Sequence, residues 1–196
     1  MAILEMIERS ATAAVISDPR QPDNPIIACN GAFLELTGYA RDEEIGRNCR
    51  FLSGPDTEPA LSETLRTGIR NRQPVLVEIL NYRRNGSTFR NAVMVAPIFD
   101  AEGELEYFLG SQVALAEPAS EMAGSRQSAA RRRIEGLSPR QREILKLMSG
   151  GKLNKQIAHA LQLSERTVKM HRAALLQALG VRANADAIRL AVEAGY

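Results

Sequence analysis

The sequence contains few of the residues from which metal centres and disulfide frameworks are built. Its 196 residues include two cysteines, two histidines and no tryptophan. So few ligands exclude a Cys/His zinc site and a disulfide framework as the basis of the fold, and we expect no metal. No uncharged apolar run is long enough to cross a membrane, and residues 1–9 are too acidic for a secretory signal. We therefore expect a soluble, cytoplasmic protein without a membrane partner.

Positive charge is scarce in one half of the chain and abundant in the other. Residues 1–115 hold 11 arginines, no lysine and 16 acidic residues, a net charge of −5. Residues 116–196 hold 14 basic and 7 acidic residues, a net charge of +7, so the total of +2 conceals a large difference. A basic half of this kind is typical of a protein that binds a polyanion, most often nucleic acid, with ordinary compositional variation as the alternative.

The length of 196 residues exceeds the about 100 to 150 residues of a usual single domain, and we expect two small cores joined by one linker. Hydrophobic periodicity is lost over residues 116–136, which are rich in alanine, serine and charge. Good helix formers at 120–134 favour a partly helical linker. The predicted division is a first domain at 1–115, the linker at 116–136 and a second domain at 137–196.

The first domain is predicted to be an α+β fold, with a five-stranded antiparallel sheet and helices on one of its faces. Asn85 and Gly86 form the strongest short hairpin signal, between two segments rich in β-branched residues. Alternation and local composition predict strands at 13–17, 26–29, 75–82, 88–97 and 105–113, and helices at 32–36, 41–44 and 59–71.

The second domain is predicted to be a small all-α domain of four helices that contains a helix-turn-helix. Residues 138–141 (SPRQ) combine an N-cap serine, a proline at the first helical position and a capping box, and Gly150 ends that helix. Asn154 and Ser164 are the expected caps of the next two helices, and the fourth covers 185–194. The expected core residues are Ile144, Leu145, Leu147, Met148, Ile157, Ala158, Leu161, Val168, Leu175 and Leu179.

The segment 46–52, GRNCRFL, is the most specific string in the chain. It closely resembles the cysteine motif of light-oxygen-voltage (LOV) flavin photosensors, a branch of the PAS fold, and the resemblance covers residues 10–115. It implies a noncovalently bound flavin mononucleotide (FMN), with FAD and riboflavin left open, and a blue-light reaction that joins the Cys49 thiol to the ring as a cysteinyl-flavin adduct. A buried structural cysteine is the alternative for Cys49, whereas Cys29, in an expected strand, is interpreted as a core residue.

Three amide side chains, Asn81, Asn91 and Gln112, lie on three successive predicted strands. The resemblance implies that they contact the polar edge of the flavin ring, and amides suit that edge because they both donate and accept hydrogen bonds. It also implies that Gln112 responds to protonation of the ring and passes the signal to the sheet. Surface amides are the alternative for Asn81 and Asn91.

Other residues near the cysteine motif match further flavin contacts of the same family. The resemblance assigns phosphate binding to Arg50 and Arg66, and a guanidinium can hold a phosphate through two hydrogen bonds. Asn48, which precedes the cysteine, matches a flavin contact. Ser53 departs from the family, in which glutamine is usual at this position, and we expect a shorter or water-filled contact with the flavin there.

Residues 137–196 resemble the LuxR-type helix-turn-helix domain of bacterial regulators, and the matching segments are 137–145, 154–158 and 163–172 (LSERTVKMHR). The resemblance implies that the third helix of this domain enters the major groove of double-stranded DNA, with Lys169 and Met170 against the base edges. A solvated charged face is the alternative for these residues. The expected phosphate contacts are Asn154, Lys155, Arg166, Thr167 and Arg172.

An apolar stripe on the last predicted helix consists of Ala187, Ile188, Ala191 and Val192. The small core cannot use all of this stripe, and the resemblance implies that it forms the interface of a homodimer. One such domain makes few base contacts, so a dimer on two half-sites is the expected DNA-binding form. RNA polymerase is a further partner that the sequence leaves open.

Together these features predict a blue-light-regulated transcription factor that is not an enzyme. In this hypothesis the last helix and the linker lie against the sensor sheet in darkness and hide the dimer stripe. The reaction at Cys49 then alters Gln112 and releases the helix-turn-helix domain for dimerisation and DNA binding. A PAS-type ligand or redox sensor with the same DNA-binding domain is the main alternative. A flavoenzyme is the other, although the sequence offers no nicotinamide-binding fingerprint.

Overall fold

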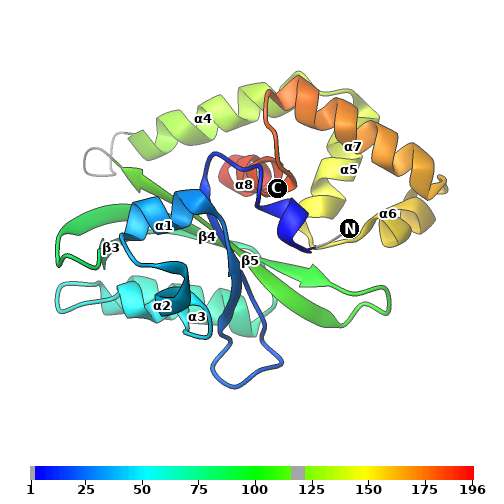
Figure 1. Ribbon diagram of the computed structural model, residues 1–196. Helices are drawn as coiled ribbons and strands as arrows, with labels where there is room; N and C mark the ends of the chain where they lie inside the picture. The colour runs from blue at the N-terminus through cyan, green and yellow to red at the C-terminus, as the bar shows by residue number, and fades with distance from the viewer. Residues whose placement is uncertain (1–2, 116–121) are drawn as a thin grey trace.

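The computed structural model describes residues 3–115 and 122–196 (Figure 1). One antiparallel sheet lies at its centre, and its strands are β1 (Ala13–Ser17), β2 (Ile26–Cys29), β3 (Val75–Tyr82), β4 (Thr88–Phe99) and β5 (Leu105–Leu115). They are arranged in the order β2-β1-β5-β4-β3. The predicted five-stranded α+β architecture is therefore confirmed. In the part of the chain that the structure describes, no helix is long and apolar enough to span a membrane.

The strands begin where the sequence predicts, and β4 and β5 each continue two residues further than expected. In β4 this extension carries the strand through Pro97 to Phe99. Val75, the first residue of β3, pairs with Val95, so β4 beyond Val95 extends past the end of its neighbour. Proline is tolerated on a free edge of this kind because no ladder hydrogen bond is required from it there.

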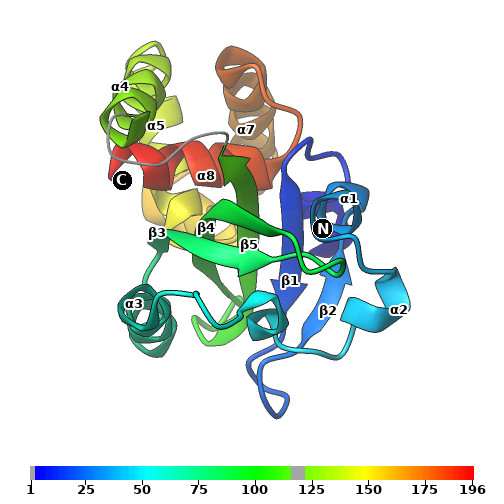
Figure 2. The ribbon, with the colours of Figure 1, turned by 90° about the vertical axis from the view of Figure 1, so that its left-hand side faces the viewer.

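Short helices cover one face of the sheet: α1 (Gly31–Thr37), α2 (Arg41–Glu44), the 3-10 helix η2 (Cys49–Leu52) and α3 (Pro59–Arg70) (Figure 2). Asn30 attaches the first of them to the sheet. Its Oδ1 accepts hydrogen bonds from the N–H groups of Phe33, in the first turn of α1, and Ala14, in β1, both at 3.0 Å. The N-cap that starts α1 therefore also fixes its position on the sheet.

The other helices lie on the opposite face: η1 (Ile3–Met6), α4 (Met122–Glu135), α5 (Pro139–Ser149), α6 (Asn154–Leu161), α7 (Glu165–Leu179) and α8 (Asn184–Ala194) (Figure 1). Helix α8 lies directly on the sheet, and α4, α5 and α7 surround it on the outer side (Figure 2). The predicted caps Ser138 and Ser164 are confirmed, since both accept hydrogen bonds from the first turns of their helices. Asn154 is the first helical residue of α6 rather than its cap, because Leu153 holds the N-cap position.

The predicted linker helix is present as α4, which packs along α8. Residues 116–121 of the predicted linker lie outside the described residues, and the domain limits at 116 and 136 stay a prediction. The turn between α6 and α7 is as tight as expected, because Gln162 adopts a left-handed conformation with φ of +54°.

The buried core does not divide at the linker, contrary to the expectation of two separate cores. Met94 and Leu109 on the sheet belong to the same cluster as Ile134 on α4, Ile144 on α5 and Ile188 on α8. The helical domain thus has no closed core of its own, because its last helix is buried against the sheet. Within the predicted helical core, Leu147 and Leu161 are only partly buried, and the other eight residues are buried.

A second, smaller cluster occupies the face of the sheet under α1 and η2. It contains Val15, Cys29, Phe33 and Leu52, with Cys49 packed against it. Alternate residues of a strand point to opposite faces, and this is why one strand can supply both clusters. The interpretation of Cys29 as a core residue is confirmed.

Candidate functional site

A cavity of about 530 Å³ lies between the sheet and the helices η2 and α3. Seven of the eight residues predicted to contact a cofactor line it, namely Asn48, Cys49, Arg50, Ser53, Arg66, Asn81 and Gln112. The eighth, Asn91, is hydrogen-bonded to two of them, Asn81 and Gln112. Apolar side chains form the remaining walls, including Leu52, Leu65, Ile69, Ile79, Val93 and Val95. Its size and its mainly apolar lining with a few converging polar groups are typical of a cofactor site.

The three predicted amides form a connected row across β3, β4 and β5. Nδ2 of Asn91 donates to Oδ1 of Asn81 at 2.9 Å and to Oε1 of Gln112 at 2.8 Å. All three side chains are buried, so the alternative of surface amides is wrong. Oδ1 of Asn91 is buried without a hydrogen-bond partner. A buried amide oxygen without a donor is costly, and the N–H at the polar edge of a flavin ring would supply one.

Cys49 lies at the opposite wall of the cavity, at the start of η2. Asn48 fixes this start because its Oδ1 accepts a hydrogen bond from the N–H of Arg50 at 3.0 Å. Burial raises the pKa of the Cys49 thiol to about 12, and the nearby charge of Glu44 acts in the same direction. The sulfur therefore carries its proton at neutral pH, in contrast to cysteines that act as thiolates.

Two arginines stand at the mouth of the cavity, as expected of phosphate contacts. Arg50 is paired with Asp23, and Nη1 of Arg66 lies 3.4 Å from Oε2 of Glu63. Both arginine side chains are exposed. A phosphate could therefore replace the carboxylates of Asp23 and Glu63 as their partner, and the displaced carboxylates would be left in solvent. Arg70 also lines the cavity and was missed in the sequence. It follows Arg66 by four residues on α3, a spacing that places both on one helix face.

The cavity therefore fits a flavin in its shape, its polar edge and its charged mouth. Amide groups converge at one end, apolar side chains form the walls and guanidinium groups lie at the opening. The residues that would hold FMN are those predicted from the cysteine motif, and their individual roles stay predictions.

The residues of α7 that are predicted to contact the bases of DNA lie on an exposed face of this helix. Arg166, Lys169 and Met170 are exposed, with Met170 at 61%. Val168, Leu175 and Leu179 are buried, as predicted for the core side of this helix. The burial pattern of α7 therefore presents the expected base-contacting residues outward.

Arg172, which is predicted to contact phosphate, differs from Arg166 and Lys169 because it is only 8% exposed in this structure. Its Nη1 donates to Oδ1 of Asn154, and burial lowers its pKa to about 10. Arg172 thus joins α7 to the first turn of α6. In this arrangement it stabilises the helix pair, and its contact with phosphate stays a prediction.

The predicted dimer stripe on α8 lies against the sheet. Ala187, Ile188 and Ala191 are buried and Val192 is partly buried. Helix α8 contacts β3 and β5, and Ile188 lies beside Leu109. The stripe is therefore covered in this structure, with Ile188 and Val192 beside residues of the sheet.

Arg189, on the same helix, is a buried contact that the sequence did not indicate. It is 6% exposed, and its Nη1 donates to the carbonyl oxygens of Ala92 at 3.1 Å and Ser111 at 3.0 Å. Its Nε donates to Oε1 of Glu193 at 2.8 Å. The Ser111 carbonyl belongs to the peptide group whose nitrogen is that of Gln112. Arg189 therefore binds the main chain of the strand that carries a cavity amide on its other face.

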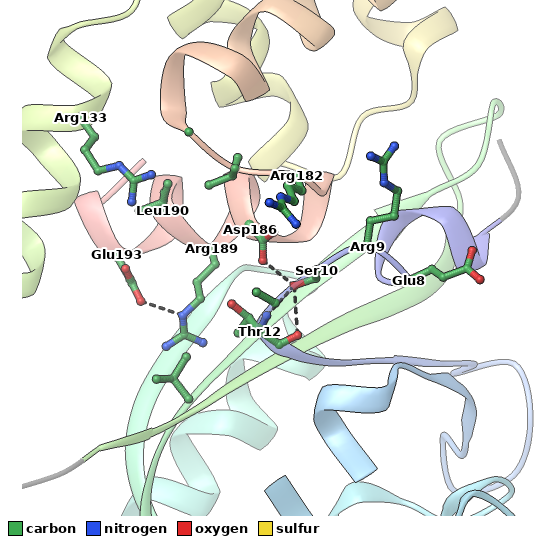
Figure 3. Close-up of a pocket in the computed structure, with 14 residues that line it drawn as sticks. Glu8, Arg9, Ser10, Thr12, Arg133, Arg182, Asp186, Arg189, Leu190 and Glu193 are labelled. Atoms are coloured by element: carbon green, nitrogen blue, oxygen red, sulfur yellow. Dashed lines mark hydrogen bonds and ion pairs between the residues drawn. The ribbon is translucent and has the colours of Figure 1, made fainter. Parts of the chain in front are cut away.

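A cavity of about 660 Å³ between the segment 8–12 and the helices α4 and α8 adjoins this contact (Figure 3). Ser10 donates to Oδ1 of Asp186 across it, and the Arg189–Glu193 pair lines it (Figure 3). The Ser10–Asp186 bond ties the chain before β1 to α8.

Comparison with known proteins agrees with both parts of this structure. Residues 12–113, just over half of the chain, match the PAS domain family, and residues 135–191 match the luxR family of bacterial regulatory proteins. The blue-light-activated histidine kinase 1 of Erythrobacter litoralis is 52% identical over 109 residues, which cover 56% of this chain and 30% of that protein. The chain thus spans less than a third of that relative.

Solved structures show the same similarity in the sensor part. The LOV domain of a blue-light activated histidine kinase from Erythrobacter litoralis is 40% identical, with a TM-score of 0.53, and the match covers 56% of this chain and 100% of that one. The light-state dimer of the fungal photoreceptor Vivid is 34% identical, with a TM-score of 0.51, and the match covers 52% and 76%. With a cysteine and an amide row facing one cavity, the chain belongs to the PAS domain family, as a LOV-type sensor joined to a luxR-family regulatory region.

Proposed function

We propose that the protein is a transcription factor whose binding to double-stranded DNA is regulated by blue light, with FMN as the chromophore. The observation that carries this proposal is the arrangement on the two faces of β5. Gln112 faces the cavity on one side, and the preceding carbonyl of Ser111 accepts a hydrogen bond from Arg189 of α8 on the other. One strand thus separates the cavity from the helix that carries the dimer stripe.

FMN, when bound, supplies absorption of blue light and a ring carbon that a sulfur nucleophile can attack. The chain supplies the sulfur and one proton at Cys49, because burial keeps that thiol protonated. The walls of the cavity exclude water, and the amide row orients the polar edge of the ring. Asn91, whose oxygen has no partner in the protein, would accept from an N–H at that edge.

Gln112 is the proposed first element of the signal. Its Oε1 accepts from Asn91 and its side chain reaches the cavity, so a new donor in the cavity would compete with Asn91 for that oxygen. Rotation of the amide would change the hydrogen bonds of β5, on which α8 rests. The proposed outcome is release of α8 and exposure of Ala187, Ile188, Ala191 and Val192.

Release of this stripe is the proposed route to a homodimer. In the closed form the sheet buries apolar side chains of α8. After release, α8 of a second copy can bury the same side chains. A light-state dimer is described for Vivid, a similar photoreceptor, which supports dimerisation as the response. The similarity to a histidine kinase lies in a region of 109 residues, and the luxR-family match follows at 135–191, so the proposed output is DNA binding rather than phosphoryl transfer.

An absorbance spectrum before and after blue light tests the proposal. We expect yellow protein that bleaches in the light and recovers in darkness. Cys49→Ala should stay yellow without bleaching, whereas Cys29→Ala, a change of the second buried thiol, should still bleach. Extraction and chromatography of the pigment identify the flavin. Wild-type protein that is yellow but does not bleach would instead favour the PAS-type ligand or redox sensor.

A further inference from the structure

A cleft of about 770 Å³ separates the sensor from the DNA-contacting helices α6 and α7. Glu5 and Glu106 line the sensor side, and Lys155 and Lys169 line the opposite side. These lysines are two of the residues predicted to contact DNA, one at phosphate and one at a base edge. The cleft therefore sets sensor carboxylates opposite the surface that DNA would occupy.

The hairpin between β4 and β5 makes direct contact with the start of α6. The N–H of Phe99 donates to the carbonyl oxygen of Gly151 at 3.1 Å, and Nε2 of Gln156 donates to the carbonyl oxygen of Asp100 at 2.6 Å. Nζ of Lys152 lies 5.5 Å from the centroid of the Phe99 ring. The hairpin projects beneath α6 (Figure 1). It uses the free edge of β4 beyond Val95 for this contact.

This segment, residues 99–106, is strongly acidic, and we call it the acidic hairpin. It carries Asp100, Glu102, Glu104 and Glu106 and has no basic residue. The side chain of Asp100 holds the turn, since its Oδ1 accepts from the N–H groups of Glu102 and Glu104 at 3.0 and 2.9 Å. Of the other three carboxylates, Glu106 lines the cleft and Glu104 lies 3.9 Å from Nη1 of Arg72.

Nucleic-acid phosphates present to a protein the same features that the sensor presents here. They carry negative charge, and their oxygens accept hydrogen bonds from lysine, glutamine and the first turn of helices. Glu106 of the acidic hairpin and Glu5 offer carboxylates opposite Lys155 and Lys169, and the Asp100 carbonyl accepts from Gln156 in the first turn of α6.

We propose that the acidic hairpin and Glu5 form a phosphate-mimicking surface that competes with duplex DNA for α6 and α7. This inference rests on the proposed function as far as the helical domain binds DNA. The proposed function already contains one form of inhibition, in which cover of the dimer stripe prevents two copies from pairing. The acidic surface adds a second form, because it prevents DNA from binding to each single copy. The competition is electrostatic. It therefore acts between charges that lie within the Debye length, which is about 8 Å at physiological salt.

Charge-neutral variants test this surface in full-length protein kept in darkness. Glu5→Gln combined with Glu106→Gln removes the two carboxylates on the sensor side of the cleft, keeps Glu165 on the α7 side and leaves Asp100 to hold the turn. The matched control is Glu35→Gln combined with Asp42→Asn, which has the same net charge change at exposed positions on α1 and α2 that do not line the cleft. The probe is a mixed-sequence DNA duplex, and its dissociation constant is measured by fluorescence anisotropy at low and moderate salt.

We expect the cleft variant to bind the duplex about threefold to tenfold more tightly in darkness than the control does, and the advantage to shrink as salt is raised. Both variants should bleach as the wild type does, because none of the four positions lines the flavin cavity. Equal affinity of the two variants would overturn the phosphate-mimicking surface, since net charge alone would explain the change.

The outcome for the proposed function is separate. A cleft variant that binds more tightly while the wild type gains no affinity in blue light would leave the acidic surface standing and contradict light regulation. Absence of duplex binding by every variant, in light and darkness, would overturn both.

Discussion

Gly151, in the turn between α5 and α6, offers a change that opposes docking of the helical domain without altering the cavity or α7. Its φ is +80°, and a Cβ atom at this position would lie 2.5 Å from the carbonyl oxygen of Pro97 and 2.8 Å from Cδ2 of Phe99. Both neighbours belong to the sensor strand β4. Gly151→Ala therefore creates a clash only while the helical domain is docked.

The size of the effect follows from two separate costs. Alanine in a left-handed conformation costs about 1–2 kcal/mol relative to glycine, and this cost is the same in the docked and released forms. The clash with Pro97 must be relieved by a shift that breaks the hydrogen bond from the Phe99 N–H, at an overpacking cost of about 1–3 kcal/mol. The docking equilibrium should therefore move about 5- to 150-fold toward the released form.

Small-angle scattering and duplex affinity in darkness measure that shift. Gly151→Ala should increase the radius of gyration and tighten DNA binding in the dark, with bleaching unchanged. Gly180→Ala is the control, since Gly180 also has a positive φ, +64°, but its Cβ would come no closer than 3.8 Å to Nη2 of Arg133. Identical dark behaviour of the two variants would refute the reasoning, because the conformational cost alone would then account for the result.

Two further predictions concern Cys49 and Arg189. Burial raises the pKa of Cys49 from about 9 to about 12, so its contribution to stability is complete below pH 9 and is lost as the pH rises toward 12. The free energy of unfolding, measured by denaturant titration at pH 8 and pH 10.5, should fall less in Cys49→Ser than in the wild type, and an equal fall would contradict the raised pKa. Arg189→Ala removes the hydrogen bonds from α8 to the Ala92 and Ser111 carbonyls and should weaken docking by about 1–3 kcal/mol, with Arg189→Lys intermediate. The measured quantity is the ratio of DNA affinity in light to that in darkness, which should drop toward 1, and an unaltered ratio in Arg189→Ala would exclude Arg189 from the coupling.

The elements of the fold could be predicted because their signals lie within a few residues of each other. The hairpin at Asn85 and Gly86, the serine cap of α5 and the helix-ending glycine after α7 each act through neighbouring backbone groups. The cavity could be predicted for a different reason. The cysteine motif carries the family resemblance, and the resemblance assigns three amides to successive strands. Antiparallel pairing of these strands then brings the amides together.

Contacts between the two parts of the chain could not be predicted from local patterns. Arg189 looks like a solvated residue in a helix, and its burial depends on carbonyl groups 97 and 78 residues earlier in the chain. Arg172 appeared available to DNA, but Asn154 accepts its hydrogen bond within the helix pair. The acidic hairpin read in isolation is an ordinary exposed turn. Its relation to α6 becomes visible through the Gln156–Asp100 and Phe99–Gly151 hydrogen bonds, which join distant parts of the chain.

The continuous core gives opening of the molecule a hydrophobic cost that is independent of the chromophore. Any state in which α8 leaves the sheet exposes Met94, Ala96 and Leu109 to water, at about 25 cal/mol for each Å² of apolar surface. A dimer formed through α8 would cover the helix but leave this sheet face bare. The apolar surface that keeps the resting protein closed therefore also favours return of the open state to the closed state. The area of this surface limits the fraction of open protein in darkness and the lifetime of the open state in the light.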